Sequence, residues 1–389
     1  MFLSFYNSGE KSIAVPYNND PLLIDFLLGF INKYKPKFQI YLYFSPGIHI
    51  LGSGRKLTNL DSFVDKSKFL SKKFDDHLEV SLKKAKKGGI KINLLLNNVL
   101  FGLPQNNKEM IADAKRVQKY LELLNNKVGI NRVTIANPYI LEIIDWEKLP
   151  NVEVKTSVNL QIKDANSIRM INILSKKWLL KDIDVIELQK DLLRDFQALK
   201  KIRRANKDCR LSIIVNEGCL IGCPYQLAHQ LHSSVFSLNK KNKINLKAPF
   251  LNTAKCKFIT HSEPWRILDS NWILPEHLKH YKNLINEIKL TDRLASTEEI
   301  INIFLAYTTG KYNDNNLCKL ISMLRMEVFE LPRLLIPEDF FIKTVLKKNA
   351  NQMYFTKIWD KIVKYNNEKS IVINTRGMSK KNLLDFINK

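Results

Sequence analysis

The chain of 389 residues contains only five cysteines, and it has no apolar run of about 18 residues or more. Without such a run, we expect no membrane span. The first residues also lack a basic segment followed by a long apolar one, so we expect no secretory signal. An odd, unevenly spread set of cysteines does not suit a framework of disulfides. We therefore expect a cytoplasmic protein, a setting in which such thiols more often bind metal.

Acidic residues are scarce beside basic ones, since 38 Asp and Glu stand against 62 Lys and Arg, a formal charge of +24. Such an excess can attract RNA, DNA or an anionic small molecule. The excess is mostly lysine, scattered among many asparagines and isoleucines, and no basic motif interleaved with aromatic residues stands out. We therefore favour a compositional origin of the charge, and an RNA partner stays open.

Short β-branched runs alternate with longer helical patterns between about residues 12 and 295. Most runs are apolar nearly throughout rather than alternating, which is typical of parallel strands covered on both faces. The runs are Ile13–Asn18, Gln39–Ser45, Ile90–Asn97, Arg132–Asn137, Val152–Asn159, Asp184–Leu188, Arg210–Asn216 and Glu287–Leu290. The helical patterns between them include Pro21–Lys33, Lys108–Asn125, Asp164–Ser175 and Leu192–Ala205. Eight such units predict an α/β fold, a closed (β/α)8 TIM-like barrel, with an open doubly wound sheet as the main alternative.

The last hundred residues are helical in pattern, as in Ser296–Tyr307, Asn316–Glu327 and Pro337–Lys348. We expect residues 1–309 to form the barrel and residues 310–389 to form a small, mostly helical C-terminal extension. After the seventh strand, residues 217–286 form a loop that is far too long for an ordinary βα connection. Loops of that length are usually functional.

A polar residue ends nearly every predicted strand. Chemistry in a barrel collects at these carboxyl ends, although each polar residue alone is more often a helix cap or turn former. As a ring they are compatible with a polar pocket. Glu187 is the best-placed candidate for general acid–base catalysis, with a structural role as its alternative. The candidates for substrate binding are Asn137, Ser157, Asn159 and Asn216.

Three of the five cysteines fall in the long loop. Cys219 and Cys223 flank a tight, glycine-containing turn, and Cys256 lies further along. Such thiols predict a zinc or iron–sulfur centre, for which His229 or another loop histidine is a candidate fourth ligand. Buried thiols that only fill space are the alternative.

The other two cysteines have simpler interpretations. Cys209 begins the seventh strand, so we expect it at the opposite face of the barrel. Cys318 lies in a helical pattern, where packing is favoured. Gln226 stands where a radical-SAM motif needs its third cysteine, and that enzyme class is therefore disfavoured.

Several segments, taken in order, resemble the U32 peptidase family of iron–sulfur barrel proteins. The likeness covers roughly residues 130–315, and its segments are Val154–Asn159, Asp184–Leu188 with Asp191–Asp195, Asn216–Pro224, Ile273–Leu278 and Ile288–Arg293. The resemblance implies a barrel with a [4Fe–4S] cluster. Several relatives hydroxylate RNA bases or a quinone precursor without oxygen, despite the peptidase label, so the resemblance implies a reaction of this kind. The better-studied relatives use four cysteines, whereas here three are suitably placed.

The leading hypothesis is a U32-like iron–sulfur enzyme, a hydroxylase rather than a protease. Its catalytic residues would be Glu187, Lys289 and Arg293, because a lysine and a guanidinium suit an anionic donor or substrate. An ion pair with a neighbouring helix is the alternative for Arg293. The substrate is RNA or a small aromatic or anionic molecule, and a protein partner stays open. The rival hypotheses are a zinc-dependent hydrolase or peptidase and a non-catalytic RNA-binding barrel.

Overall fold

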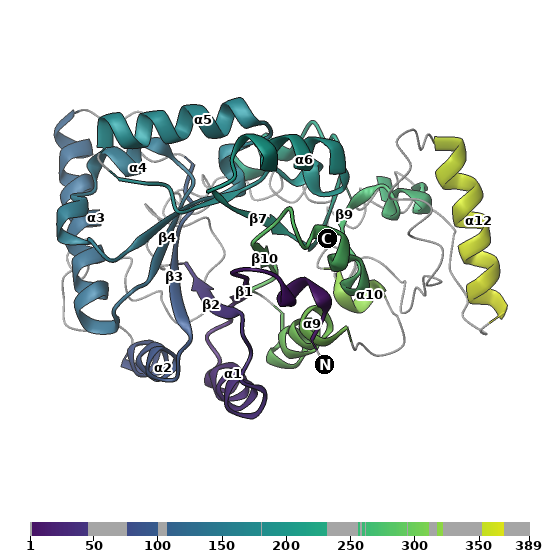
Figure 1. Ribbon diagram of the computed structural model, residues 1–389, viewed down its shortest axis with the longest axis horizontal. Coiled ribbons are helices and arrows are strands. Elements are labelled where there is room, and N and C mark those ends of the chain that lie inside the picture. The colour runs from purple at the N-terminus through teal and green to yellow at the C-terminus, as the bar shows by residue number, and fades with distance from the viewer. Residues whose placement is uncertain are drawn as a thin grey trace, which may run out of the picture.

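Eight parallel strands close into a barrel in a computed structural model that describes residues 2–45, 76–99, 107–179, 181–231, 256, 259–260, 262–293, 295–310, 317–321 and 352–368. Their spatial order is β1-β10-β7-β6-β5-β4-β3-β2 (Figure 1). The strands are β1 (Ser12–Pro16), β2 (Gln39–Phe44), β3 (Lys91–Leu96), β4 (Arg132–Ile135), β5 (Glu153–Thr156), β6 (Val185–Glu187), β7 (Arg210–Ile214) and β10 (Glu287–Lys289). Each lies within one of the eight predicted runs or within one residue of it. The predicted (β/α)8 TIM-like barrel is confirmed, and the open sheet is excluded.

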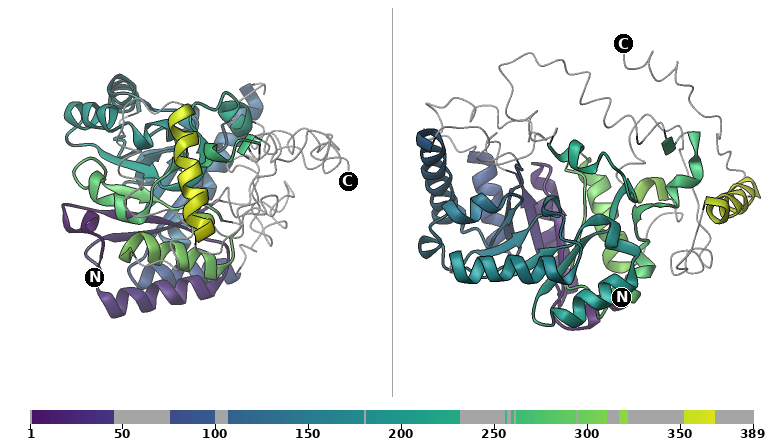
Figure 2. Two further views of the ribbon diagram at one scale, coloured as in Figure 1. Left: turned by 90° about the vertical axis from the view of Figure 1, so that its right-hand side faces the viewer. Right: turned by 90° about the horizontal axis from the view of Figure 1, so that it is seen from above.

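Helices follow the strands and cover the outside of the barrel (Figures 1 and 2). They are α1 (Pro21–Tyr34), α2 (Asp76–Lys87), α3 (Asn107–Val128), α4 (Pro138–Ile143), α5 (Ala165–Leu174), α6 (Phe196–Ala205) and α9 (Thr297–Thr309). Local sequence sets their starts. Asp20 caps α1 by accepting the Leu22 N–H, and proline occupies the first turn. Ser296 and Glu299 form a capping box at α9.

The strands alternate in character, which corrects the prediction that most are apolar throughout. In β1, Ile13 and Val15 belong to the large core between sheet and helices, whereas the side chain of Ser12 hydrogen-bonds Glu287 within the barrel. Only the outer face is packed against helices, so only that face must be apolar. A small apolar cluster on β1, β2 and β3 fills part of the interior, namely Ala14, Tyr41, Tyr43 and Leu95.

The segment between β7 and β10 contains ordered structure that the prediction of a single loop at 217–286 did not include. Strands β8 (Asn216–Leu220) and β9 (Ser270–Trp272) pair antiparallel outside the barrel. Arg194 donates two hydrogen bonds to the carbonyl of Trp272, from Nε at 3.2 Å and Nη2 at 3.0 Å, and one to that of Leu268. Two short helices, η7 (Pro264–Ile267) and η8 (Pro275–Tyr281), flank β9. The cysteine-bearing segment is therefore anchored to the barrel by a small two-stranded sheet.

Beyond α9, the described residues form α10 (Leu317–Leu320) and α12 (Gln352–Glu368), and α12 contacts η7. Cys318 is buried in α10, which confirms the packing interpretation. The predicted helix at 337–348 lies outside the described residues, and the division at residue 309 stays a prediction. None of the helices in the described ranges has both the length and the apolar character needed to cross a bilayer.

Candidate active site at the barrel mouth

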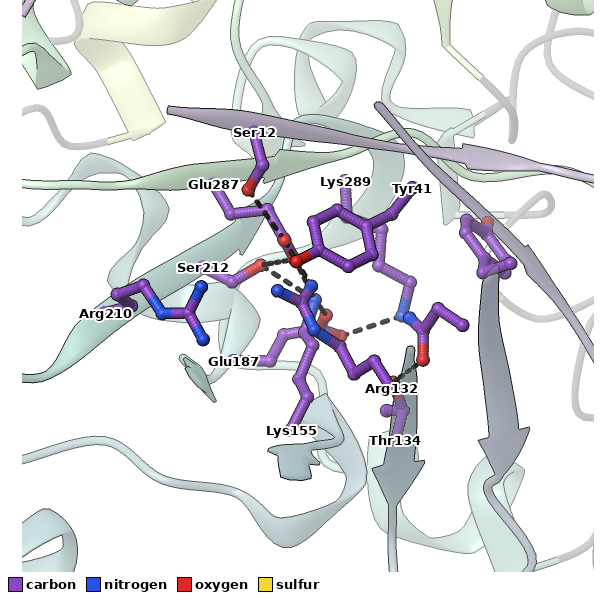
Figure 3. Close-up of polar contacts among 12 residues, drawn as sticks. Ser12, Tyr41, Arg132, Thr134, Lys155, Glu187, Arg210, Ser212, Glu287 and Lys289 are labelled. Carbon is purple, nitrogen blue, oxygen red and sulfur yellow. Dashed lines mark hydrogen bonds and ion pairs between the residues drawn. The ribbon is translucent and has the colours of Figure 1, made fainter. Parts of the chain in front are cut away.

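Charged side chains form a continuous series of ion pairs through the interior of the barrel (Figure 3). Glu287 on β10 accepts from Arg132 Nη1 at 2.5 Å and from Lys155 Nζ at 2.6 Å. Lys155 also contacts Glu187 Oε2 at 2.6 Å, and the other oxygen of Glu187 lies 2.9 Å from Lys289 Nζ. The first four residues are at most 1% exposed and Lys289 is 8% exposed. We refer to Arg132, Glu287, Lys155, Glu187 and Lys289 as the charge ladder.

The charge ladder runs from the amino-terminal end of the barrel to its mouth. Arg132 and Glu287 are the first residues of their strands, whereas Glu187 and Lys289 are the last residues of theirs. Residues two apart on a strand share a face, so Glu287 and Lys289 both point inward while Ile288 belongs to the outer core. The ladder therefore ends in an ammonium group where barrel enzymes perform their chemistry.

The lower end of the ladder is anchored by further polar contacts. Arg132 Nε donates to Glu153 Oε2 at 2.9 Å, and its guanidinium carbon lies 3.6 Å from the centre of the Tyr41 ring. Glu153 also pairs with Arg210 at 3.0 Å and accepts from the Tyr41 hydroxyl at 3.0 Å. These contacts contribute to the stability of the barrel, because this face lies opposite the mouth.

The ladder keeps its carboxylates ionised. Burial raises the pKa of Glu187, but the ammonium groups of Lys155 and Lys289 outweigh it, and the pKa ends below its ordinary value. Burial lowers the pKa of Lys289, and the attraction of Glu187 only partly offsets this effect. An ionised Glu187 held by two lysines is better suited to orienting Lys289 than to donating a proton. Its catalytic role stays a prediction.

Three cysteines lie in the segment that follows β7. Cys219 lies on β8, and Cys256 interacts electrostatically with both Cys219 and Cys223. Burial, with Glu217 nearby, raises the pKa of Cys219 to about 12. Burial and the neighbouring Cys223 raise the pKa of Cys256 to about 11. As free thiols these groups are protonated, and metal coordination would deprotonate them.

A lysine from a neighbouring barrel unit reaches this cysteine group. Lys190 Nζ lies 2.6 Å from Glu217 Oε1 and 3.5 Å from Cys219 Sγ. Burial disfavours its ammonium form, but Cys219 and Glu217 outweigh burial and raise the pKa of Lys190. Glu217 also favours the ammonium form of Lys289, so this carboxylate acts on both the cysteine group and the end of the charge ladder.

The other predicted ligand positions are placed as follows. His229 lies in a helical turn over residues 226–231, directly after the Cys223 turn, and its N–H donates to the carbonyl of Tyr225. Two other loop histidines, at 232 and 261, lie outside the described residues. Cys209 packs beside the amino end of β7, away from the mouth, as predicted. Within the described part of the chain, no three His, Cys, Asp or Glu side chains are grouped as a metal site.

The predicted ring of polar residues makes mainly structural contacts. Asn137 caps α4 by accepting the Tyr139 N–H. Ser157 caps the short helix η4 (Val158–Leu160) by accepting the backbone N–H of Asn159. The side-chain amide of Asn159 donates to the carbonyl of Asn97 at 3.4 Å. Capping was the alternative for such residues. Their substrate contacts stay predictions.

Asn216 and Arg293 lie at the same end of the barrel. Asn216 is fully buried, accepts the Thr291 N–H at 2.7 Å and donates to the carbonyl of Leu320 at 3.2 Å, so it ties β8 to the segments after β10 and α9. Arg293 follows β10 and is partly exposed. Its predicted role toward an anion stays a prediction.

Four residues of the site were not singled out from the sequence. They are Arg132, Lys155, Lys190 and Glu287. A usable signal existed for Arg132, Lys155 and Glu287, because each lies next to an apolar residue in a short strand, and neighbouring residues of a strand point to opposite faces of the sheet. Val154-Lys155-Thr156 and Glu287-Ile288-Lys289 show this pattern.

Comparison with known proteins gives one similar curated sequence. It is "Uncharacterized protease MJ1657" from Methanocaldococcus jannaschii, 26% identical over 294 residues, which are 75% of this chain and 77% of the relative. No family model matches the chain.

Two solved structures illustrate the structural comparison. "The Structure of the U32 Peptidase Mk0906" is 13% identical with a TM-score of 0.44, covering 73% of this chain and 92% of that one. A thermostable xylanase mutant from Cellvibrio japonicus is 13% identical with a TM-score of 0.32, covering 72% and 85%.

The sequence match agrees with features of the chain itself. The match to the archaeal relative spans about three quarters of both proteins. It accompanies ordered U32-like motifs, among them the cysteine segment on β8 and the segment of β10 that carries Lys289. The closed barrel agrees with the fold that those motifs imply. The chain is similar to this archaeal relative, and its motifs resemble those of the U32 peptidase family.

Proposed function

We propose that the protein is an enzyme that holds an iron–sulfur cluster at Cys219, Cys223 and Cys256 and modifies a substrate at the barrel mouth. The observation that carries this proposal is that these thiols act electrostatically on one another beside Lys190, near the end of the charge ladder. Two of them come from one turn, and the third is supplied by a distant part of the same segment. Thiols that serve only packing have no need to gather next to a buried ammonium group.

The donor chemistry fits such a cluster. Thiolates are the usual protein ligands of iron–sulfur centres, and His229 or a loop histidine is a candidate for the remaining iron. Lys190 provides an N–H donor to a ligand sulfur, a contact that commonly accompanies such centres. When bound, the cluster would supply an electron-transfer centre or a Lewis-acidic iron.

The ladder gives the mouth an affinity for anions. Its end at the mouth is the cation Lys289, whereas Arg132 and Lys155 each contact two carboxylates. Lys289 shares its single ladder partner, Glu187, with Lys155, and it faces the Tyr43 ring at 5.3 Å. A carboxylate or phosphate of the substrate would give Lys289 a second anionic partner. The substrate is thus an anionic molecule, either small or part of RNA, and the proposed reaction is hydroxylation.

Peptide hydrolysis is the second candidate, because the archaeal relative is named a protease. A zinc ion on the same thiols would serve that reaction by activating water. The two candidates require different metals, so metal content separates them.

The test is anaerobic purification followed by measurement of iron, acid-labile sulfide and zinc. We expect a brown protein with iron and sulfide, and loss of both in Cys219→Ser, Cys223→Ser and Cys256→Ser. The matched control is Cys209→Ser, because Cys209 is a half-buried thiol at the other end of the barrel. A colourless zinc protein that cleaves peptides would support the second candidate. Salt-sensitive RNA binding with neither metal would support a non-catalytic barrel.

A further inference from the structure

We infer that Lys190 is a positioning residue that holds the Cys219 sulfur and sets the reduction potential of the cluster, with Glu217 acting in the opposite direction. The inference rests on the proposed cluster.

The geometry places one ammonium between a carboxylate and a sulfur. Glu217 and Cys219 flank Gly218 on β8, and both contact the same ammonium group. Lys190 approaches that face from the start of η6 (Lys190–Arg194), directly after β6, with contacts of 2.6 Å and 3.5 Å. The Lys190 side chain is 9% exposed and that of Glu217 is 25% exposed. The three groups are therefore shielded from most of the screening by salt.

The backbone that carries Lys190 is tied to the backbone that carries Cys219. Gln189 caps η6 by accepting the Asp191 N–H at 2.8 Å, and Asp191 accepts from Asn271 of β9 at 3.1 Å. At the other end of η6, Arg194 binds the carbonyl of Trp272. Because β9 pairs with β8, these contacts fix the lysine relative to the sulfur from both ends of η6.

Electrostatics gives the direction of each effect. Reduction adds one negative charge to a cluster, so a nearby ammonium stabilises the reduced form more than the oxidised form. An N–H donor to a ligand sulfur acts in the same direction, because hydrogen bonds and net charge set cluster potentials. A carboxylate at a similar place stabilises the oxidised form. Lys190 should therefore raise the potential and Glu217 should lower it.

The test is an anaerobic redox titration of the cluster-loaded full-length protein, followed by absorbance and electron paramagnetic resonance. Lys190→Met should make the midpoint potential more negative. The expected size is roughly tenfold in the ratio of reduced to oxidised cluster at a fixed potential, about 59 mV for a one-electron couple. Glu217→Gln should make the potential more positive. Lys190→Arg keeps the charge, and Lys200→Met removes an exposed lysine on α6, so both should match the unmodified protein.

Opposite shifts in Lys190→Met and Glu217→Gln support the inference, because a purely structural role would change cluster occupancy without opposite changes in potential. Unchanged potentials in both variants overturn it, as do shifts in the same direction. If Lys190→Met loses its cluster, Glu217→Gln decides alone: a positive shift supports the inference, and no shift overturns it. An unmodified protein without iron and sulfide would instead refute the proposed function.

Discussion

Glu287→Gln is the sharpest perturbation of the charge ladder, because it removes one charge and almost no volume. Glu287 is 1% exposed and binds two cations that are 0% exposed, Arg132 and Lys155. Removing one partner of a buried ion pair typically costs about 3–5 kcal/mol. Each cation keeps a second carboxylate, Glu153 for Arg132 and Glu187 for Lys155. We therefore expect a loss near the low end, about 3 kcal/mol of unfolding free energy.

The same substitution should have a pH signature. Burial alone raises the pKa of Glu287, but Arg132 and Lys155 outweigh it and hold the pKa far below the ordinary value of 4.5. A carboxylate with a depressed folded-state pKa stabilises the fold fully above its unfolded-state pKa, and this contribution is lost as the pH falls toward the folded-state pKa. The penalty of Glu287→Gln should thus be constant above about pH 5.5 and shrink as the pH drops below about 4.5.

The assay is denaturant unfolding followed by circular dichroism at several pH values. Glu263→Gln is the control, because Glu263 forms an ion pair with Arg266 in which both side chains are about one third exposed or more. Such pairs contribute less than about 1 kcal/mol. A Glu287→Gln penalty no larger than that of Glu263→Gln, or one independent of pH, would refute the reasoning.

Further substitutions test other parts of the structure. Burial, with His280 and Lys279 adding repulsion, lowers the pKa of His277 to about 4. In the unfolded chain this histidine takes up its proton near pH 6.5, so the unfolding free energy falls as the pH drops from 6.5 to 4. His277→Gln should flatten that decline, as measured by melting temperatures across this pH range. Arg194→Met should speed amide hydrogen exchange in β9 but not in β4, because it removes three bonds to the carbonyls of Leu268 and Trp272. Asn216→Ala should lower the unfolding free energy by about 1–3 kcal/mol, because it leaves the partly buried Thr291 N–H without its acceptor.

The barrel was predictable because its signals are local. The strands are short runs rich in apolar residues, and such runs recur between helical patterns along the chain. The two-stranded sheet of β8 and β9 was not predictable in this way. Asn216–Leu220 contains glycine and asparagine, which are poor strand formers, and its partner Ser270–Trp272 is distant in the sequence. Pairing across such a separation depends on the folded barrel.

The site was predicted in part. The sequence places Cys219, Cys223 and Cys256 in one segment after a barrel strand, and their role as metal ligands stays a prediction. The charge ladder was not expected, because its contacts cross the interior. Arg132 and Glu287 lie on β4 and β10, which are not neighbours in the barrel. Alternation along a strand indicates that a side chain faces inward, but only the closed barrel determines which charge it meets.

The most direct test of the central claim is Mössbauer spectroscopy of the anaerobically purified, iron-enriched protein. We expect the spectrum of several magnetically coupled irons bridged by sulfide, absent from Cys256→Ser and intact in Cys209→Ser. A protein that contains zinc instead of iron, or whose iron signal survives Cys256→Ser unchanged, would contradict the account.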